Sequence, residues 1–341
     1  MANNDLRAAQ KNKADEFYTS LEDIEKEMRY YKEHFKGKVI YCNCDDPYES
    51  NFFKYFALNF NHLGLKKLIS VSYAGSPFAG EEFGLFENMG KEYTINGKKA
   101  YKVVMVELQD VTGDGRENLD DIREIIKHRI RYLKGDGDFR SEESIELLKE
   151  ADIVVTNPPF SLFREFVAQL VFYEKKFIIL GNQNAITYKE FFPLIKDEKV
   201  WIGSSIHNGD REFRVPHSYN VSKNYRYDDK GNKYVRVRGP RWFTNLDYKE
   251  RHDWLDLYKK YTPEEYPKYD NYDAINVDKT ADIPQDYDGV MGVPITFLDK
   301  YCPEQFEIIT MSTMSGKSAN YWSMINGKAK YSRIFIRRKK D

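Results

Sequence analysis

The sequence predicts an α/β protein whose parallel strands are joined by crossover helices. Helical and strand patterns alternate through the first 205 residues, as they do in repeated β-α-β units. Of the 341 residues, 41% are hydrophobic and 15% aromatic, which is enough apolar surface for a core, while the 31% that are charged indicate a water-soluble surface. A chain that is disordered throughout is therefore excluded.

The N-terminal part predicts a helix, a strand, a second helix and a second strand. Ser20 can cap a helix whose apolar side chains recur about every 3.6 residues, and Gly37 ends it. Val39–Cys42 has the composition of a short buried strand. An aromatic-rich helical pattern over residues 52–63 and a strand pattern over residues 68–73 follow.

The chain then leaves this alternation and returns to it. Asn96 and Gly97 stand between two apolar runs, which is a strong signal for a β-hairpin. Apolar positions from Leu119 to Leu133 predict a helix that Gly135 closes. Helix, strand, helix and strand patterns then resume over residues 145–148, 152–156, 163–170 and 176–180.

After about residue 205 the helical periodicity fades, and we expect a domain boundary there. Tyr, Arg, Asn and Gly crowd together, and prolines interrupt the chain. Residues 289–297 and 306–310 have extended patterns, and we expect them to rejoin a sheet.

The formal net charge of −1 argues by itself against a nucleic-acid partner, but the charges are segregated along the chain. Lys and Arg far outnumber Asp and Glu in residues 223–241 and again in residues 328–341. Both basic stretches lie in the second half, so a local anionic partner remains compatible with the sequence.

The cysteines favour a reducing, cytoplasmic setting. Cys42, Cys44 and Cys302 are too few for a disulfide framework, and zinc would need further ligands that the six scattered histidines do not offer at a suitable spacing. The Gly-Asp-Gly-Asp turn at residues 135–138 lacks the glutamate of a calcium loop. The polar start and the lack of an apolar run of about 18 residues argue against secretion and membrane spans. We expect no metal.

One turn carries the most chemical information: Asn157-Pro158-Pro159-Phe160, directly after the strand pattern of residues 152–156. Open α/β sheets bind ligands beyond the carboxyl ends of their strands. The prolines fix φ and remove two amide donors, which leaves the Asn157 side-chain oxygen and the Pro158 carbonyl as acceptors. With Phe160 as a stacking surface, the turn suits a planar substrate with an exocyclic amine, whose nitrogen it would prepare to attack an electrophile. Taken alone, the tetrapeptide also fits a turn that merely ends a strand.

Together with five other stretches, this turn resembles the EcoRI-type adenine-specific DNA methyltransferases. The resembling stretches span residues 15–19, 41–47, 137–141, 157–160, 241–245 and 292–301, so the likeness covers almost the whole chain. It implies a class I S-adenosylmethionine-dependent methyltransferase fold, with a Rossmann-like mixed sheet and a C-terminal DNA-recognition region. The expected parts are a catalytic domain with the cofactor site over residues 1–205, a target-recognition region over 206–290, and a segment over 291–341 that packs back on the core and ends in a basic tail.

The resemblance also implies the cofactor, S-adenosyl-L-methionine, and a set of residues that bind it. The candidates are Phe17, Tyr18, Thr19, Asn43, Asp45, Asp46, Asp138 and Phe139. The chain departs from the common methyltransferase pattern in two places. It lacks the glycine-rich loop after the first strand, and its second strand ends at Ser72 and Tyr73 instead of an acidic residue that would hold the ribose.

In the second half, the resemblance and the basic charge together indicate DNA contacts. Lys and Arg bind phosphates without regard to sequence, and tyrosines among them can stack on unstacked bases. The candidates for DNA contact are Lys223, Arg226, Arg236, Arg238, Arg241, Trp242, Asn245 and His252. The family implies a palindromic, GAATTC-like site in double-stranded DNA and a partner restriction endonuclease in the same system.

The implied mechanism extrudes the adenine from the helix, since its amine cannot reach a cofactor inside the duplex. Asn157 and Pro158 would hold the amine and Phe160 would stack on the base, so that positioning and electrostatics lower the barrier. Two alternatives stay open at this point: a methyltransferase that acts on RNA adenine or on a glutamine amide in protein, and a non-catalytic DNA-binding protein on the same fold.

Overall fold

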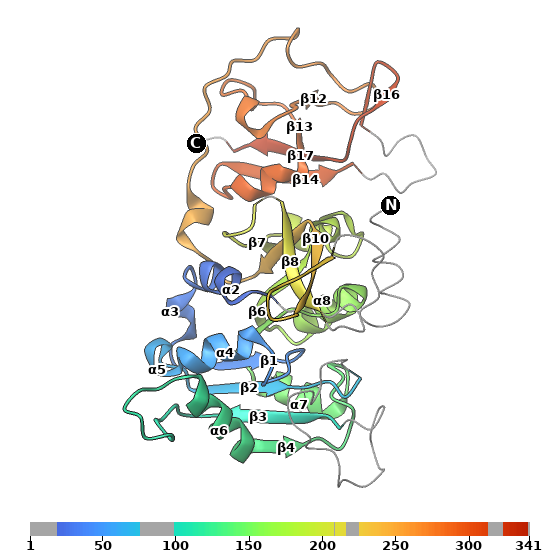
Figure 1. The fold of residues 1–341 in the computed structure, drawn as a ribbon. Coiled ribbons are helices and arrows are strands. Elements are labelled where there is room, and N and C mark those ends of the chain that lie inside the picture. Colours follow the sequence, from blue (N-terminus) through green and yellow to red (C-terminus); the bar gives the residue numbers. More distant parts are fainter. Residues whose placement is uncertain (1–18, 76–98, 208, 216–224, 313–322, 340–341) are drawn as a thin grey trace. The chain divides into compact units, whose positions relative to one another are not determined.

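A computed structural model describes residues 19–75, 99–207, 209–215, 225–312 and 323–339 (Figure 1). The chain forms two compact units. The first comprises residues up to 183 together with 208–246, and the second comprises residues 184–207 together with 247–341. These limits differ from the expected divisions at 205 and 290, because residues 208–246 return to the first unit, where they add a strand to its sheet.

The first unit is built on a mixed sheet, which confirms the α/β fold class. Its strands follow the order β4-β3-β2-β1-β5-β6-β11. They are β1 (Val39–Cys42), β2 (Lys67–Val71), β3 (Tyr101–Met105), β4 (Ile130–Tyr132), β5 (Ile153–Thr156), β6 (Lys176–Asn182) and β11 (Pro240–Thr244). The four central strands β2, β1, β5 and β6 run parallel, whereas β3 and β11 run antiparallel to their neighbours.

The strand order reverses between β1 and β5. The chain passes from β1 to β2 on one side and later returns to place β5 on the other side, with Tyr41 opposite Val154. Because β1 and β5 are parallel, the segments that follow them leave the sheet at the same edge. In open α/β sheets, such a switch point is where ligands bind.

Helices lie on both faces of this sheet, as Figure 1 shows, with α2, α4 and α6 on one face and α7 and α8 on the other. The helices of the first unit are α2 (Leu21–Met28), α3 (Lys32–Phe35), α4 (Asn51–Leu58), α5 (Phe60–Leu63), α6 (Leu119–Arg129), α7 (Glu142–Glu150), α8 (Phe163–Phe172) and the 3-10 turn η1 (Phe160–Leu162). The predicted N-cap is present, since the Ser20 hydroxyl accepts from the Asp23 amide, but the helix predicted to run to Gly37 is divided into α2 and α3.

One predicted helix is too long. Its last turn instead forms β4, in which Ile130 and Tyr132 pair with Val103 and Tyr101 of β3. Local periodicity favoured helix there, but pairing with the edge of the sheet supplies the backbone hydrogen bonds instead. The predicted turn at Asn96 and Gly97 lies outside the described residues.

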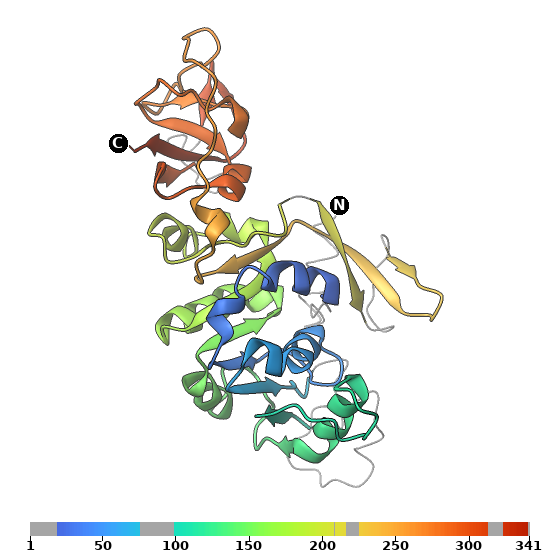
Figure 2. The same ribbon diagram turned by 90° about the vertical axis from the view of Figure 1, so that its left-hand side faces the viewer.

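A smaller antiparallel sheet belongs to the same unit. It consists of β8 (Asp210–Val215), β10 (Lys233–Arg238) and β9 (Tyr225–Tyr227), in that order. Figure 2 shows it as a twisted ribbon beside α2, and an ion pair of 3.4 Å joins Arg211 of β8 to Asp23 of α2. On β10, Val235 and Val237 are buried whereas Arg236 and Arg238 are exposed, so one face packs on the unit and the other is basic.

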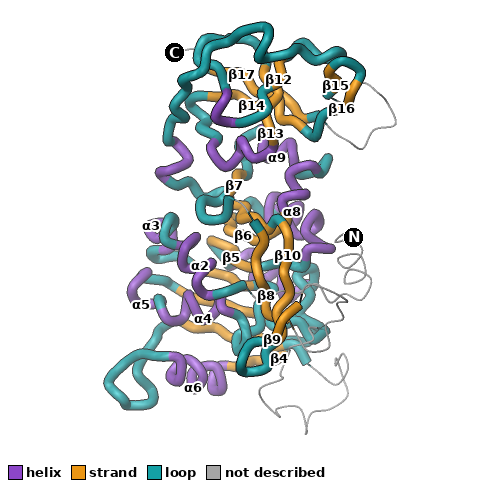
Figure 3. The backbone as a smooth tube through the Cα atoms, turned by 45° about the horizontal axis from the view of Figure 1, so that its top comes forward, coloured by secondary structure: helices purple, strands orange, loops and turns teal. Residues whose placement is uncertain are grey.

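The second unit contains a four-stranded sheet in the order β12-β13-β17-β14 and a small hairpin. Its elements are α9 (Phe192–Lys196), β7 (Trp201–Ile202), η3 (Lys249–His252), β12 (Ile275–Asn276), η4 (Thr280–Asp282), β13 (Met291–Pro294), η5 (Ile295–Lys300), β14 (Phe306–Met311), β15 (Met324–Ile325), β16 (Lys328–Ala329) and β17 (Arg333–Arg338), with η2 (Gln183–Thr187) at its start. The extended segments predicted near residues 289–297 and 306–310 are thus strands β13 and β14, and long loops precede β13 (Figure 3).

Candidate active site

The Asn-Pro-Pro-Phe turn leaves the sheet at the switch point, directly after β5. Asn157 is 6% exposed. Pro158 is also buried, while Pro159 and Phe160 are half-buried, with Phe160 opening the 3-10 turn η1. The turn therefore combines a buried amide with a partly accessible aromatic ring.

The segment after β1 lies against this turn through Asp45. One oxygen of its carboxylate accepts a hydrogen bond from the Thr156 hydroxyl, and the other accepts from the Ser50 hydroxyl at 2.7 Å. Burial raises the pKa of Asp45 to about 7, although the two hydroxyl hydrogen bonds oppose that shift. Asp45 thus links the end of β5 to Ser50, the N-cap of α4.

Asp46 has a similar environment on the other side of the same loop. It accepts hydrogen bonds from the Tyr101 hydroxyl at 2.7 Å and from the Tyr48 amide at 2.9 Å. Burial raises its pKa to about 6, against the hydrogen bond from Tyr101. A carboxylate has about four acceptor sites, so these contacts leave both Asp45 and Asp46 able to accept from a ligand.

Thr19 and Asn51 complete the surroundings of the asparagine. The Asn157 Nδ2 group donates to Thr19 Oγ1 at 3.3 Å, and Asn51 Nδ2 donates to the Thr19 carbonyl at 2.8 Å. Of the N-terminal candidates only Thr19 can be located, because Phe17 and Tyr18 lie outside the described residues.

The segment with the predicted cofactor contacts Asp138 and Phe139 approaches the end of β2. Gly137 has φ of 77°, and a Cβ there would lie 2.3 Å from the Ser72 carbonyl oxygen, so this close approach requires glycine. The Gly-Asp-Gly-Asp sequence therefore has a packing explanation. Asp138 forms an ion pair with Arg140 at 2.6 Å, and the Phe139 ring is buried against Phe166.

Sequence reasoning missed Asn51 and Tyr101. Asn51 follows the residue that caps a helix, and Tyr101 lies in an ordinary strand pattern, so neither carries a motif. Their partners Thr19 and Asp46 stand 32 and 55 positions away in the chain, and only the fold brings them together.

The small sheet presents three of the predicted DNA-contacting arginines. Arg226, Arg236 and Arg238 have side-chain exposures of 52%, 65% and 73%. Arg226 pairs with Glu212 at 2.7 Å and Arg236 with Asp210 at 2.8 Å. Two exposed tyrosines, Tyr225 and Tyr227, lie on the adjacent strand β9. Lys223 lies outside the described residues.

Three other residues that were predicted to contact DNA are buried or hydrogen-bonded within the protein instead. Trp242 is fully buried, with its ring 5.8 Å from that of Phe52, and Arg241 is 3% exposed. Asn245 accepts from the Phe177 amide and donates to the Lys175 carbonyl, which holds the start of β6. Arg241 and Trp242, two of the residues expected to contact DNA, are therefore buried in this structure, because β11 pairs with β6 inside the large sheet.

His252, in the second unit, lies between two carboxylates. Its Nε2 is 2.9 Å from Asp247 and its Nδ1 is 2.8 Å from Glu304. The hydrogen bonds to Asp247 and then to Glu304 raise the pKa of His252. Both ring nitrogens of His252 are thus already in contact with acidic side chains.

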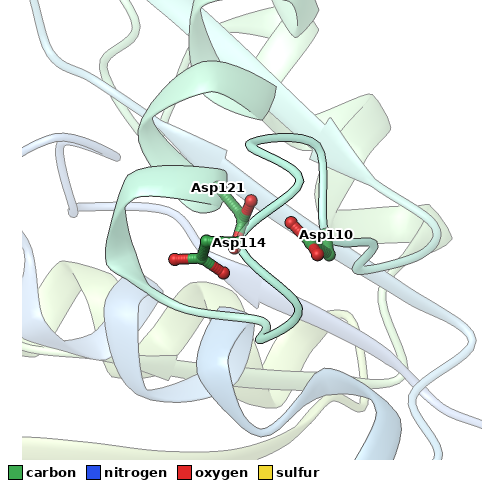
Figure 4. A group of neighbouring side chains, drawn as sticks. All are labelled: Asp110, Asp114 and Asp121. Atoms are coloured by element: carbon green, nitrogen blue, oxygen red, sulfur yellow. The ribbon is translucent and has the colours of Figure 1, made fainter.

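A cluster of three aspartates lies at the start of α6: Asp110 and Asp114 are in the preceding loop, and Asp121 is in the first turn of the helix (Figure 4). Asp121 accepts from the amides of Val111 and Thr112, and Asp110 accepts from the amides of loop glycines. These contacts hold the loop together, and hydrogen bonds of this kind do not by themselves indicate a metal.

The described residues include no helix that is both long enough and apolar enough to cross a membrane.

The chain is similar over almost its full length to known proteins. The model of a family described as adenine-specific methyltransferase EcoRI matches residues 5–339. The chain is 50% identical over 343 residues to the type II methyltransferase M.EcoRI of Escherichia coli, which covers 98% of this chain and 96% of that protein. It is 37% identical over 352 residues to the type II methyltransferase M.MpnI of Mycoplasma pneumoniae, with 98% of each chain covered. No solved structure matches significantly.

Proposed function

The chain belongs to the EcoRI family of adenine-specific methyltransferases, and on that premise we propose how it methylates adenine in DNA. The Asn157 turn holds the exocyclic amine of an extruded adenine while the nitrogen takes up a methyl group. The observation that carries this proposal is the place of the turn, at the switch point of the sheet and directly after β5.

The turn offers one hydrogen-bond acceptor to each N–H bond of the amine. Asn157 Oδ1 and the Pro158 carbonyl accept its two N–H bonds, and Phe160 stacks on the purine. Hydrogen bonds from both N–H groups draw the nitrogen toward tetrahedral geometry and direct its lone pair at the methyl carbon. A bound cofactor would supply the methyl group, and the nitrogen that accepts it would release a proton to water. Positioning and electrostatics lower the barrier without a strong base.

The cofactor is S-adenosyl-L-methionine, which supplies the methyl group on a positively charged sulfur. The chemistry of the residues at the switch point fits it, because the buried acceptors Asn43, Asp45 and Asp46 suit its ammonium and hydroxyl groups. Asp138 and Phe139 follow Gly137, which lies against Ser72 just after β2, and they would bind the adenosine part of the cofactor. Phe17 and Tyr18 complete the proposed set, and the hydroxyl of Thr19, the third N-terminal candidate, contacts Asn157.

The substrate is double-stranded DNA, and the exposed basic face of the small sheet supports this. Arg226, Arg236 and Arg238 would contact phosphates, with Lys223 next to them in sequence and His252 as a further candidate. Asn245 stays a weaker candidate because its amide already binds backbone groups. We propose a palindromic, GAATTC-like recognition site and a partner restriction endonuclease in the same system. Extrusion of the adenine costs a few kcal/mol of stacking and pairing.

Transfer of tritiated methyl groups to DNA, RNA and protein, assayed side by side, tests the proposal. The wild-type protein should label adenine in duplex DNA, and Asn157→Ala should abolish the label while leaving DNA binding intact. Label that enters only RNA or only glutamine would support the alternative substrates instead. No label in any substrate, together with tight DNA binding, would support a non-catalytic DNA-binding protein.

A further inference from the structure

An asparagine side chain has two chemically different ends. Its oxygen accepts hydrogen bonds and its NH₂ group donates them. The proposed reaction needs the oxygen of Asn157 to face the substrate, because two NH₂ groups brought together would present donors to donors. Some neighbouring group must therefore fix the rotation of this amide.

Thr19 has the position to do so. Asn157 Nδ2 donates to Thr19 Oγ1 at 3.3 Å. The two residues are 6% and 3% exposed, so water competes little for this contact. With its NH₂ group held by Thr19, the amide turns its oxygen the other way.

Thr19 is itself held in place by Asn51, whose Nδ2 donates to the Thr19 carbonyl at 2.8 Å. Asn51 is the first residue of α4, and its neighbour Ser50 donates to Asp45 at 2.7 Å. Asp45 in turn binds the hydroxyl of Thr156, the residue that precedes the asparagine. These contacts form a closed ring that ties the end of β5, the start of α4 and the N-terminal segment together.

We propose that Thr19 is a positioning residue that orients the amide of Asn157 toward the substrate amine, and that Asn51 braces Thr19 for this role. The proposal rests on the proposed function and deepens it. It also differs from the role expected of Thr19 as a cofactor contact, and the two roles predict different kinetics.

Single-turnover methyl transfer at saturating S-adenosylmethionine and DNA separates them, with calorimetry to measure the cofactor Kd. Thr19→Val keeps the shape but removes the hydroxyl, and Thr19→Ser keeps the hydroxyl. Asn51→Ala removes the brace. Asn59→Ala is a matched control, because Asn59 also donates from its side chain to a carbonyl, that of Tyr55 at 2.8 Å, at the far end of α4.

Misplacement of a reacting group by about 1 Å can cost about 100-fold in rate. We expect Thr19→Val to lower the saturating rate by about 100-fold and Asn51→Ala by about tenfold. The cofactor Kd of both variants should stay within about threefold of the wild-type value, and Thr19→Ser and Asn59→Ala should keep nearly the full rate.

A Thr19→Val rate equal to that of the wild type overturns the proposal. So does a weakened cofactor Kd with a normal rate at saturation, which would make Thr19 a cofactor contact only. If Thr19→Val does not fold, equal rates for Asn51→Ala and Asn59→Ala overturn the proposal, and a slower Asn51→Ala supports it. If the wild-type protein itself transfers no methyl group to adenine, the proposed function fails, which is a distinct result.

Discussion

The Asp45 carboxyl should make the folded protein less stable as pH rises. Replacing Asp45 by Asn should remove this contribution. Asp45 is 7% exposed, and burial raises the pKa of its carboxyl from 3.8 to about 7. Between these two values the folded protein keeps a proton that the unfolded chain has lost. Because the folded state binds more protons in this window, the free energy of unfolding falls as pH rises through it, and the loss is complete above the folded pKa.

The magnitude follows from the two pKa values. One pKa unit corresponds to about 1.4 kcal/mol, so this carboxyl alone lowers the free energy of unfolding by about 2 to 3 kcal/mol between about pH 5 and about pH 8. Asn cannot ionise, yet its amide keeps a donor and an acceptor for Ser50 and Thr156. The stability of Asp45→Asn relative to the wild type should therefore rise by that amount over the same range.

Urea unfolding at several pH values in this range measures the difference directly. Glu33→Gln serves as a control, since Glu33 is exposed on α3 and should show no such trend. A difference between Asp45→Asn and wild type that stays constant with pH would refute the reasoning, because it would mean that burial does not hold the proton on Asp45.

Three further predictions concern the site and the basic surface. Phe160→Ala should slow single-turnover methylation by about 10- to 100-fold, because stacking of a base contributes about 1 to 3 kcal/mol, whereas Phe160→Tyr keeps the ring and most of the rate; equal rates for the two variants would contradict stacking. Arg236→Ala should reduce the salt dependence of DNA binding by about one ion, measured by fluorescence anisotropy, while Arg123→Ala, which also removes an arginine paired with an aspartate, should not. Trp242→Ala should lower the free energy of unfolding by about 3 to 5 kcal/mol in urea titrations because it empties a core position. A variant that stays stable but prefers a different DNA sequence would instead indicate that Trp242 contacts DNA.

The sequence predicted the part of the site that local pattern encodes. Asn157 follows a β-branched strand and precedes a helix, and such a turn at a strand end marks a ligand-binding edge whatever the rest of the chain does. In the structure this turn directly follows β5. The hydrogen bond from Asn157 to Thr19 spans 138 positions, and no spacing rule connects two residues so far apart.

The differences between prediction and structure also arise from contacts between residues that are far apart in the sequence. Ile130 and Tyr132 continue a helical period, but pairing with β3 competes successfully with it. Arg241 and Trp242 belong to residues 241–245, a stretch that resembles the family, and this resemblance does not indicate whether a side chain is buried. Their burial follows from the return of β11 to the large sheet, and this return is a long-range event that composition does not encode.

The most direct test of the central claim is nucleoside mass spectrometry of DNA from cells that express the protein. The account predicts N6-methyldeoxyadenosine in cells with the wild-type protein, confined to one short palindromic sequence, and none above background in cells with Asn157→Ala. Unmodified adenine in the wild-type cells, or equal methylation with Asn157→Ala, would contradict it.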